Sequence, residues 1–406
     1  MPTDSQAALT TAFKYKIELS LMIGRKNVTI PQSSIKAIII NSMYDKNTMP
    51  VIYISLRLSS TIYTQMVLNS DKATLGFRIF KYDDKTNSSI LEPYIEDNFS
   101  YIMPNDPNYN NALEQYVSAS STAYNDNSDS YLEGYIALIS LKSISDNMRL
   151  TNAILKDTDI MSIVHKYTSH MTMCIEPFDN KDHIDQFIIP PITSVTALLS
   201  FLNDNYCFYK SGYRYFRSFN MTYLLSLKGN PVHEGSNKFD TVIISICDPI
   251  DDLGKSNAIE LDRKNHAYII YVDANDTSIR IDRFANKQYN SIIGVDTDGN
   301  TIQEELRVAA TPDSTEKVFL ERHDNLDNIY GTKAAIESLS VVVTVTKTEI
   351  DSTVLTPNKQ YQIKHYSESR EYDGKYILSY KKEILTQKGD SYIGAVMFGL
   401  RRIIED

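Results

Sequence analysis

Apolar and polar residues alternate along several stretches of the N-terminal third of the chain. From Phe13 to Ile23, every second residue is apolar and the residues between are mostly polar. Because successive side chains of a strand point to opposite faces, this stretch predicts a strand with one buried face. Further strands are predicted at residues 28–30, 35–41, 51–59, 74–82 and 135–141. Regular strands separated by turn residues favour an antiparallel sandwich or barrel.

Near residue 150 the spacing of apolar residues becomes helical. Two segments each begin with a capping side chain followed by apolar residues at i, i+3, i+4 and i+7. The first has its cap at Thr158 or Asp159 and the apolar face Ile160, Ile163, Val164 and Tyr167. The second has its cap at Thr193 or Ser194 and the apolar face Val195, Leu198, Leu199 and Leu202, and it ends at residues 203–205.

Strand patterning returns after residue 230. The predicted strands are residues 240–247, 267–272, 340–348, 361–365, 372–380 and 391–401, of which the last two pair. Asp298 and Gly299 predict a hairpin turn at residues 296–300, since Asp-Gly supplies the positive φ that tight hairpins require. These strands predict a second β-barrel.

The order of these patterns predicts a mainly β fold with an α+β insert and three domains. Residues 1–145 form a first β-barrel, residues 146–230 an α+β module, and residues 231–406 the second barrel. Within the first part, residues 105–130 are rich in Asn, Asp and Ser and lack an apolar period. We predict a long surface loop there, ordered by a partner.

Composition and charge exclude several classes of protein. A hydrophobic content of 42% with 23% charged residues is that of a globular chain. The net charge is −10 and no long basic run occurs, which argues against a dedicated binder of double-stranded DNA. No apolar run approaches the roughly 20 residues that span a bilayer, and residues 1–6 show no secretory signal. The three cysteines are widely spaced and fit neither a zinc site nor a disulfide framework.

Aromatic and basic residues are interleaved between residues 206 and 223. Aromatic rings next to arginine can stack on single-stranded nucleic acid. A two-sided aromatic strand, with a core on one face and a subunit contact on the other, accounts for the same pattern and is the interpretation we prefer. The candidate contacts with a subunit or partner are Tyr209, Tyr213, Arg214, Tyr215, Arg217 and Tyr223.

No pattern of catalytic, cofactor-binding or metal-binding residues emerges. His165, His170, Cys174 and His183 match no standard zinc spacing. Asp296, Asp298 and Asn300 resemble a calcium loop, but Gly299 comes too early for an EF-hand, and a hairpin turn explains them better. Nucleophile-elbow, P-loop and dinucleotide-binding fingerprints are absent from the sequence. We therefore predict that the protein is not an enzyme and has no catalytic, cofactor or metal site.

The order and pattern of many segments resemble baseplate hub proteins of contractile phage tails, including T4-like and Mu-like hubs and late control protein D. The segments are 15–19, 28–30, 34–40 and 49–56 in the first part, 189–202, 208–216 and 221–226 in the middle, and 355–363 and 372–378 at the end. The resemblance spans most of the chain and rests on pattern and order. The Asn- and Ser-rich residues 105–130 are not part of it.

The resemblance implies a structural virion protein of the tail baseplate, made in the host cytoplasm. It implies a homotrimer in which three chains with two tube-like barrels each form a pseudo-sixfold ring with a central channel. That ring is expected to join the tail tube protein to the central spike protein, with the tape measure protein as a further partner. Two alternatives stay open: a receptor- or glycan-binding β-rich virion protein, and a cell-wall hydrolase, which would need a carboxylate pair or a metal.

Overall fold

The protein is described here from a computed structural model. The described residues are 6–9, 13–44, 49–83, 93–103, 131–209, 211–219, 221–232, 239–247, 259–273, 277–281, 291–295, 300–305, 317–319, 341–348, 351–365 and 373–403. Most of them lie in strands, which confirms the mainly β fold predicted from the sequence. Every described helix is too short or too polar to span a lipid bilayer.

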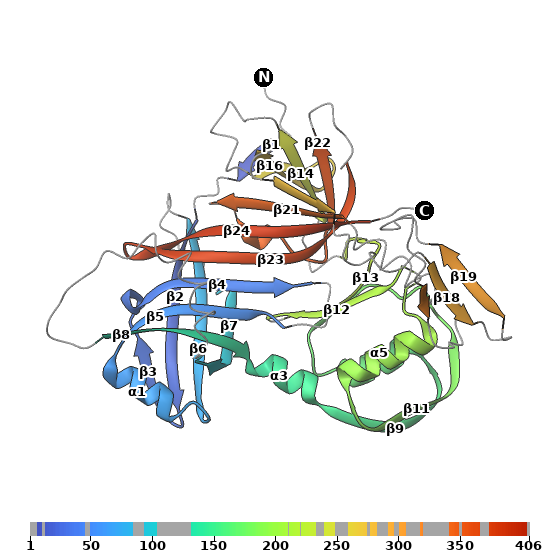
Figure 1. Ribbon diagram of the computed structural model, residues 1–406, viewed down its shortest axis with the longest axis horizontal. Coiled ribbons are helices and arrows are strands. Elements are labelled where there is room, and N and C mark those ends of the chain that lie inside the picture. Colours follow the sequence, from blue (N-terminus) through green and yellow to red (C-terminus); the bar gives the residue numbers. More distant parts are fainter. Residues whose placement is uncertain are drawn as a thin grey trace.

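Eight strands form a closed barrel, which is drawn mostly in blue in Figure 1. In order around the ring they are β23 (Gly374–Lys388), β4 (Ile35–Met43), β5 (Val51–Ser59), β8 (Tyr131–Ser140), β7 (Ile95–Ile102), β6 (Ala73–Asp83), β2 (Phe13–Ile23) and β24 (Ser391–Arg402). Pairing between β23 and β24 closes the ring. Two strands from the end of the chain therefore complete a barrel that begins at residue 13.

The closing seam between β2 and β24 is narrow. The two strands pair at Tyr15 and Tyr392. The Tyr392 hydroxyl lies 2.9 and 2.8 Å from the carbonyl oxygens of Gln32 and Ile35, so it ties β24 to the chain that leads into β4. A buried tyrosine thus supports the seam where backbone pairing is sparse.

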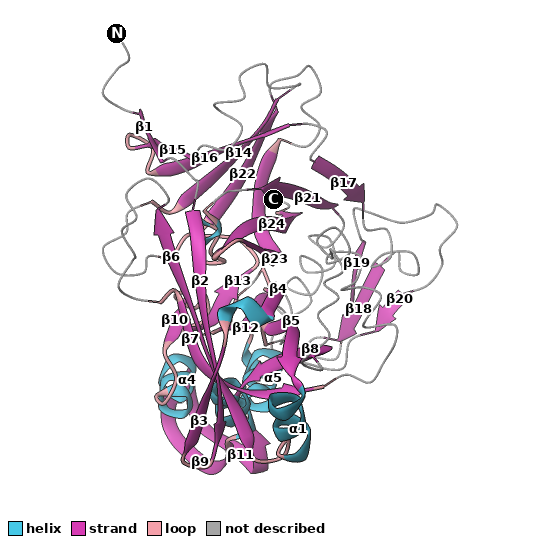
Figure 2. Ribbon diagram, turned by 90° about the vertical axis from the view of Figure 1, so that its left-hand side faces the viewer, coloured by secondary structure: helices cyan, strands magenta, loops and turns pink. Residues whose placement is uncertain are grey.

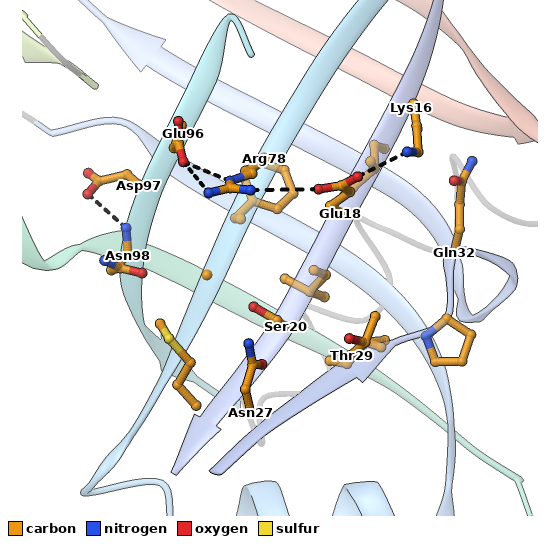
Figure 3. Close-up of a pocket in the computed structure, with 17 residues that line it drawn as sticks. Lys16, Glu18, Ser20, Asn27, Thr29, Gln32, Arg78, Glu96, Asp97 and Asn98 are labelled. Carbon is orange, nitrogen blue, oxygen red and sulfur yellow. Dashed lines mark hydrogen bonds and ion pairs between the residues drawn. The ribbon is translucent and has the colours of Figure 1, made fainter. Parts of the chain in front are cut away.

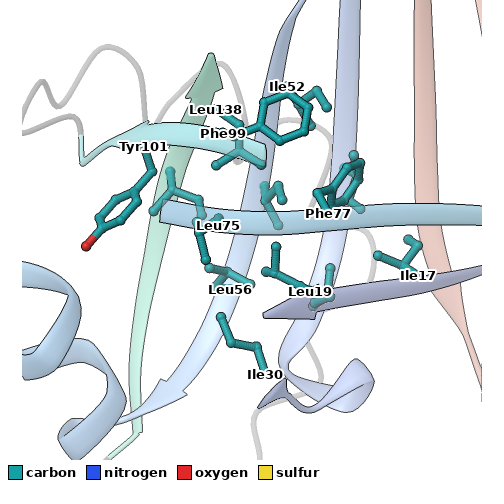
Figure 4. Packing of buried hydrophobic residues seen from close by; sticks show 14 of the residues in the cluster. Ile17, Leu19, Ile30, Ile52, Leu56, Leu75, Phe77, Phe99, Tyr101 and Leu138 are labelled. Carbon is teal, nitrogen blue, oxygen red and sulfur yellow. The ribbon is translucent and has the colours of Figure 1, made fainter. Parts of the chain in front are cut away.

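Apolar side chains fill the barrel (Figure 4). Each of the eight strands contributes at least one buried apolar side chain to this core, and β2, β5 and β6 contribute four each. Met66 of α1 (Ser60–Leu68) and Ile30 of β3 (Lys26–Ile30) close it from the sides. Phe77 and Phe99 pack edge to face with their ring centroids 5.9 Å apart. The alternation predicted for residues 13–23 is confirmed, since Tyr15, Leu19 and their inward neighbours are buried.

A second β body lies above the barrel in Figure 1 and shares its long hairpin of β23 and β24. On one side β23 continues into β22 (Gln360–His365), β14 (Thr241–Cys247), β16 (Ala267–Asp273), β15 (Ile259–Asp262) and β1 (Gln6–Leu9). On the other side β24 continues into β21 (Val341–Thr348) and β17 (Thr277–Ile281). A separate apolar core fills this body, which we call the C-terminal β body.

A helical module lies beside the barrel, at the lower right of Figure 1. Its helices are α3 (Leu141–Met148), α4 (Ile160–Thr168) and α5 (Val195–Tyr206). Its strands are β9 (Leu150–Asp159) and β11 (His183–Ser194), which pair with each other, and β10 (Met173–Ile175), β13 (Met221–Ser226) and β12 (Tyr213–Ser218), which form a second sheet. The apolar faces of α4 and α5 meet between these sheets in a third core.

The remaining described elements are short. They are the sheet of β19 (Thr301–Glu305), β18 (Ser291–Val295) and β20 (Lys317–Phe319), and the 3-10 helices η1 (Gln32–Ser34) and η3 (Ser352–Val354). The antiparallel pair β18 and β19 confirms the predicted hairpin, whose turn at residues 296–299 lies outside the described residues.

Several predictions from the sequence can be checked directly. Both predicted helices are confirmed, with caps at Asp159 and Ser194, although α5 continues to Tyr206. Helices α1 and α3 were not predicted, and the strand predicted at 135–141 begins at Tyr131 and gives way to α3 at Leu141. The loop predicted at residues 105–130 lies outside the described residues. The division at residues 145 and 230 stays a prediction, but the barrel draws two strands from beyond residue 373.

Candidate functional site

The predicted contact segment lies where the three apolar cores meet. Successive residues of β12 point to opposite faces, so Tyr215 enters the core of the helical module and Phe216 enters the core of the C-terminal β body. Phe216 stacks on Tyr223 with centroids 5.2 Å apart. Just after the strand, Phe219 reaches the core of the barrel. The five residues 215–219 thus join all three parts of the molecule.

Arg214 is buried, with 2% of its surface exposed, and it connects the helical module to the C-terminal β body. Its Nε donates to the carbonyl oxygen of Ser226 at 3.3 Å, which belongs to the same sheet. Its Nη1 and Nη2 donate to the carbonyl oxygens of Leu378 and Pro357, at 3.2 and 3.1 Å. Only arginine offers a planar fork of donors that reaches three separate carbonyl groups.

Arg217 makes the corresponding connection toward α3. Its Nη1 donates to the Asp146 carboxylate, and its Nε donates to the carbonyl oxygen of Phe219 at 3.3 Å. Both charged side chains are buried, so each neutralises a charge that would be costly alone. Burial raises the pKa of the neighbouring Tyr215 to about 12, and the nearby Arg217 cation offsets part of that rise.

Tyr209 and Glu176 form a buried polar network behind β13. The Tyr209 hydroxyl lies 2.7 Å from the carbonyl oxygen of Glu176, to which it donates. The Glu176 carboxylate accepts hydrogen bonds from the Ser226 backbone N–H at 2.7 Å, the Ser226 hydroxyl at 2.9 Å and the Asn230 side chain at 3.0 Å. Burial raises the pKa of Tyr209 well above its ordinary range, so this hydroxyl remains a donor.

The structure thus gives the predicted contact residues roles inside the chain. Tyr209, Arg214, Tyr215, Arg217 and Tyr223 are buried. Because the rings of these tyrosines are buried, they present no exposed face on which a nucleic-acid base could stack. Tyr213 is half-buried, with its hydroxyl 3.4 Å from the Ser200 hydroxyl. Contact of these six residues with another subunit stays a prediction.

A second buried polar cluster lies at one mouth of the barrel, and the sequence analysis missed it. Lys81 of β6 forms an ion pair of 2.5 Å with Asp351, which precedes η3. Lys381 of β23 lies 3.4 Å from the Glu383 carboxylate, which also accepts a hydrogen bond from Ser352. Burial alone lowers the pKa of Lys381, but Glu383 and other nearby groups raise it more, so the net pKa is raised. Residues this far apart in sequence give no local signal.

An open groove of about 770 Å³ crosses the outer face of β2, β3, β6 and β7 (Figure 3). Its wall is a ladder of exposed charges in which Arg78 Nη2 lies 2.6 Å from Glu96 and Lys16 lies 3.0 Å from Glu18. Gly76 lies between Ser20 and Asn98 on the neighbouring strands. Because glycine has no side chain, the groove is deeper at this position. Exposed ion pairs of this kind contribute little to stability.

The histidines and cysteine considered in the sequence are not brought together as a metal site. Among the described residues, the group of potential ligands that does gather is Asp157, His183 and Asp185. These side chains are exposed where β9 and β11 meet, with His183 Nε2 3.8 Å from Asp157 Oδ1. Exposed carboxylates gather in this way without an ion, so the geometry assigns no metal here.

The fold matches solved structures of two tail proteins over nearly the whole chain. A tail protein from Neisseria meningitidis MC58 is 10% identical, with a TM-score of 0.51, over 95% of this chain and 96% of that one. The 43 kDa tail protein of prophage MuSo2 from Shewanella oneidensis is 8% identical, with a TM-score of 0.51, over 95% and 97%. At these identities the likeness concerns the fold, and at that level the resemblance predicted from the sequence is confirmed.

A search of curated protein sequences gave no match. The family model described as Bacteriophage PBS1 gene 109 protein matches residues 6–403. That match includes the barrel, the helical module and the C-terminal β body. The chain belongs to the Bacteriophage PBS1 gene 109 protein family.

Proposed function

We propose that this protein is a structural component of a phage tail baseplate, namely the hub that joins the tail tube to the central spike. The observation that carries the proposal is the pair of β bodies built on one shared hairpin, in a phage protein family whose fold matches two tail proteins end to end. Three copies supply six β bodies, so a homotrimer presents pseudo-sixfold symmetry to a hexameric tube and threefold symmetry to the spike.

The interior of the barrel supports a particular position for the central channel. Apolar side chains from all eight strands fill it, and the ionic cluster of Lys81, Asp351 and Glu383 occupies one mouth. A solute cannot pass through a core packed to the density of a protein interior. The channel of the proposed ring therefore lies between the three copies, on the symmetry axis.

The proposed partners follow from this role. They are two further copies of the chain, the tail tube protein on one side and the central spike protein on the other, with the tape measure protein as a further partner inside the tail. An obligate ring of this kind buries about 2,000–5,000 Å² at each interface. The proposed location is the baseplate of the virion, after synthesis in the host cytoplasm, and the proposed role is mechanical and involves no catalysis.

The native mass of the purified chain tests the proposal. We expect a species of three 46.2 kDa chains in native mass spectrometry and light scattering, and a ring with a central channel and pseudo-sixfold outline in negative-stain images. Because assembly can require a partner, the measurement is repeated on the chain co-expressed with the tube and spike proteins of the same phage. A chain that stays monomeric in both preparations overturns the hub proposal.

A further inference from the structure

Residues 351–359, which we call the strap, contact all three parts of the molecule. Val354 and Leu355 are buried in the core of the C-terminal β body. Asp351 reaches Lys81 of the barrel, and the carbonyl oxygen of Pro357 accepts from Arg214 of the helical module. At the end of the strap, Lys359 Nζ donates a hydrogen bond to the carbonyl oxygen of Val354 at 2.7 Å, which stabilises the conformation of the strap.

The strap meets the barrel through charges and hydrogen bonds. On β6 the inward positions Leu75, Phe77 and Ile79 are apolar, and Lys81 continues that alternation two residues further along. Its ammonium group lies 2.5 Å from Asp351 and 3.3 Å from the Thr353 hydroxyl.

Beside this contact, Lys381 Nζ donates to the carbonyl oxygen of Ser352 at 3.2 Å, and Ser352 donates to Glu383. The two cations and two carboxylates, Lys81, Lys381, Asp351 and Glu383, balance in charge. Each is at most 12% exposed at its side chain. The contact is therefore a neutral and largely dry ionic cluster.

A bend in the shared hairpin lies close to this cluster. Strand β23 pairs with β22 through residues 374–376 and with β4 through residues 380–386, and its register with β24 shifts between Leu378 and Tyr380. Such a bulge bends a strand and increases its local twist. Opposite it stands Gly399, where a side chain would overlap the Tyr380 ring. The hairpin thus has a natural bending point where it passes from one β body to the other.

A buried ion pair contributes little net stability, but it constrains the relative positions of the two groups that form it. Removing two charges from water costs about as much as their attraction returns, and apolar replacements of equal size are often as stable. Apolar surfaces can slide over one another at little cost. A buried ion that moves away from its partner, in contrast, becomes an unpaired buried charge, which is costly. A cluster that spans a bending point is therefore suited to selecting one orientation.

We propose that the ionic cluster of Lys81, Asp351, Lys381 and Glu383 is a latch that fixes the orientation of the C-terminal β body relative to the barrel. The strap supplies Asp351 to this latch, and strands β6 and β23 supply the other three residues. The bulge at residues 378–380 is the hinge that the latch restrains. The latch is a property of the single chain, so it holds or fails independently of the hub proposal.

The test measures the distance between the two β bodies in solution. Spin labels are placed on cysteines at Lys72, beside α1 on the barrel, and at Lys264, in the turn between β15 and β16; both positions are exposed. Cys247, which is half-buried, is replaced by serine, and the buried Cys174 and Cys207 are retained. Pulsed electron paramagnetic resonance then gives the distribution of label distances in the full-length chain.

Two variants remove the latch in different ways. Lys81→Met with Asp351→Leu replaces the ion pair by apolar groups of similar size, and we expect a Tm within about 3 °C of the parent but a broadened distance distribution. Asp351→Asn keeps the size and the Thr353 contacts but leaves the buried Lys81 charge without this carboxylate, so it should lower the Tm more than the double variant and broaden the distribution at least as much. The matched control is Arg78→Met with Glu96→Leu, an exposed ion pair within the barrel, which should leave the distribution unchanged.

A narrow distribution that persists in both latch variants overturns the proposal, because apolar packing alone would then set the orientation. Broadening in the control as well as in the latch variants also overturns it, because any loss of charge would then have the effect. If the double variant does not fold, Asp351→Asn decides the question on the same two readings.

Discussion

The interior of the barrel and the junction between the parts are both buried, yet they are built from different chemistry. Inside the barrel the buried side chains of the eight strands are almost all apolar, and none of them depends on one specific partner. At the junction the buried groups are Arg214, Arg217, Lys81, Asp351 and Glu383, and each has specific partners. The comparison suggests that packing supplies most of the stability, whereas the buried charges specify how the parts are arranged.

The largest effect is expected from a cavity in the barrel. Phe99 is fully buried and packs edge-on to Phe77, so Phe99→Ala should lower the free energy of unfolding by about 3–5 kcal/mol. Ile102→Ala, on the same strand but 53% exposed, is the control and should change it by about 0.5 kcal/mol or less. Denaturant titration at equilibrium measures both. Equal small losses in the two variants would mean that the barrel interior is not tightly packed, and would contradict the view that its packing supplies most of the stability.

A smaller but still large effect is expected at the junction. Arg214→Met keeps the length of the side chain but leaves the carbonyl oxygens of Leu378, Pro357 and Ser226 without their donor. We expect a loss of about 3 kcal/mol in the free energy of unfolding.

Arg214→Lys should recover less than half of that loss, because an ammonium group cannot match the planar fork. Arg78→Met, at the exposed ion pair with Glu96, is the control and should cost at most about 0.5 kcal/mol. The same titration measures all three variants. Full recovery by lysine would show that the charge alone matters and would contradict a role in geometry.

Much of the fold could be predicted from the sequence because its signals are local. The strand at residues 13–23 shows its buried face through period two, and α4 and α5 show theirs through apolar spacing and a capping residue. Helix α1 has no such signal, since Met66 is its one fully buried residue and Val67 and Leu68 are exposed. Its existence depends on the barrel against which it packs.

Closure of the barrel could not be predicted, because the pairing partners are hundreds of residues apart. Tyr15 pairs with Tyr392, and Ile39 pairs with Ile384. Alternation says that a strand has a buried face but does not say which strand lies beside it. The period of residues 372–380 and 391–401 predicted a pair, and the structure confirms it, but the second role of that pair in the barrel is visible only in three dimensions.

The candidate site shows the same limit. Alternation along residues 208–217 predicted an aromatic strand with a core on one face and a subunit contact on the other. The strand begins at Tyr213, and it has a core of this chain on each face. The sequence did not indicate that Arg214 would reach carbonyl groups at Pro357 and Leu378, more than 140 residues away. Nor did Lys81 and Asp351, 270 residues apart, reveal that they form a pair. Buried charges at a junction depend on tertiary contacts, which leave no periodic trace.

The smallest expected effect lies in the helical module, where the relevant interaction is local and exposed. The Asp159 carboxylate caps α4 by accepting hydrogen bonds from the Ser162 backbone N–H at 2.8 Å and the Ser162 hydroxyl at 2.7 Å. These bonds lower the pKa of Asp159. A carboxyl group whose pKa is lowered on folding adds stability above its unfolded pKa, and that contribution disappears as the pH falls through the folded pKa.

Asp159→Ala should therefore cost about 1 kcal/mol at pH 7, and the difference from the parent should shrink as the pH falls below about 4. Ser194→Ala removes the cap of α5, a hydroxyl that accepts from the Ala197 N–H at 3.2 Å and does not titrate in this range. Its cost should stay constant over the same pH series, measured by denaturant titration. If the two costs decline together, acid weakens the whole module, and the cap at Asp159 is not the group that titrates. If only the Asp159 difference declines, this charge acts locally, in contrast to the buried charges of the junction, whose effects extend between the parts of the molecule.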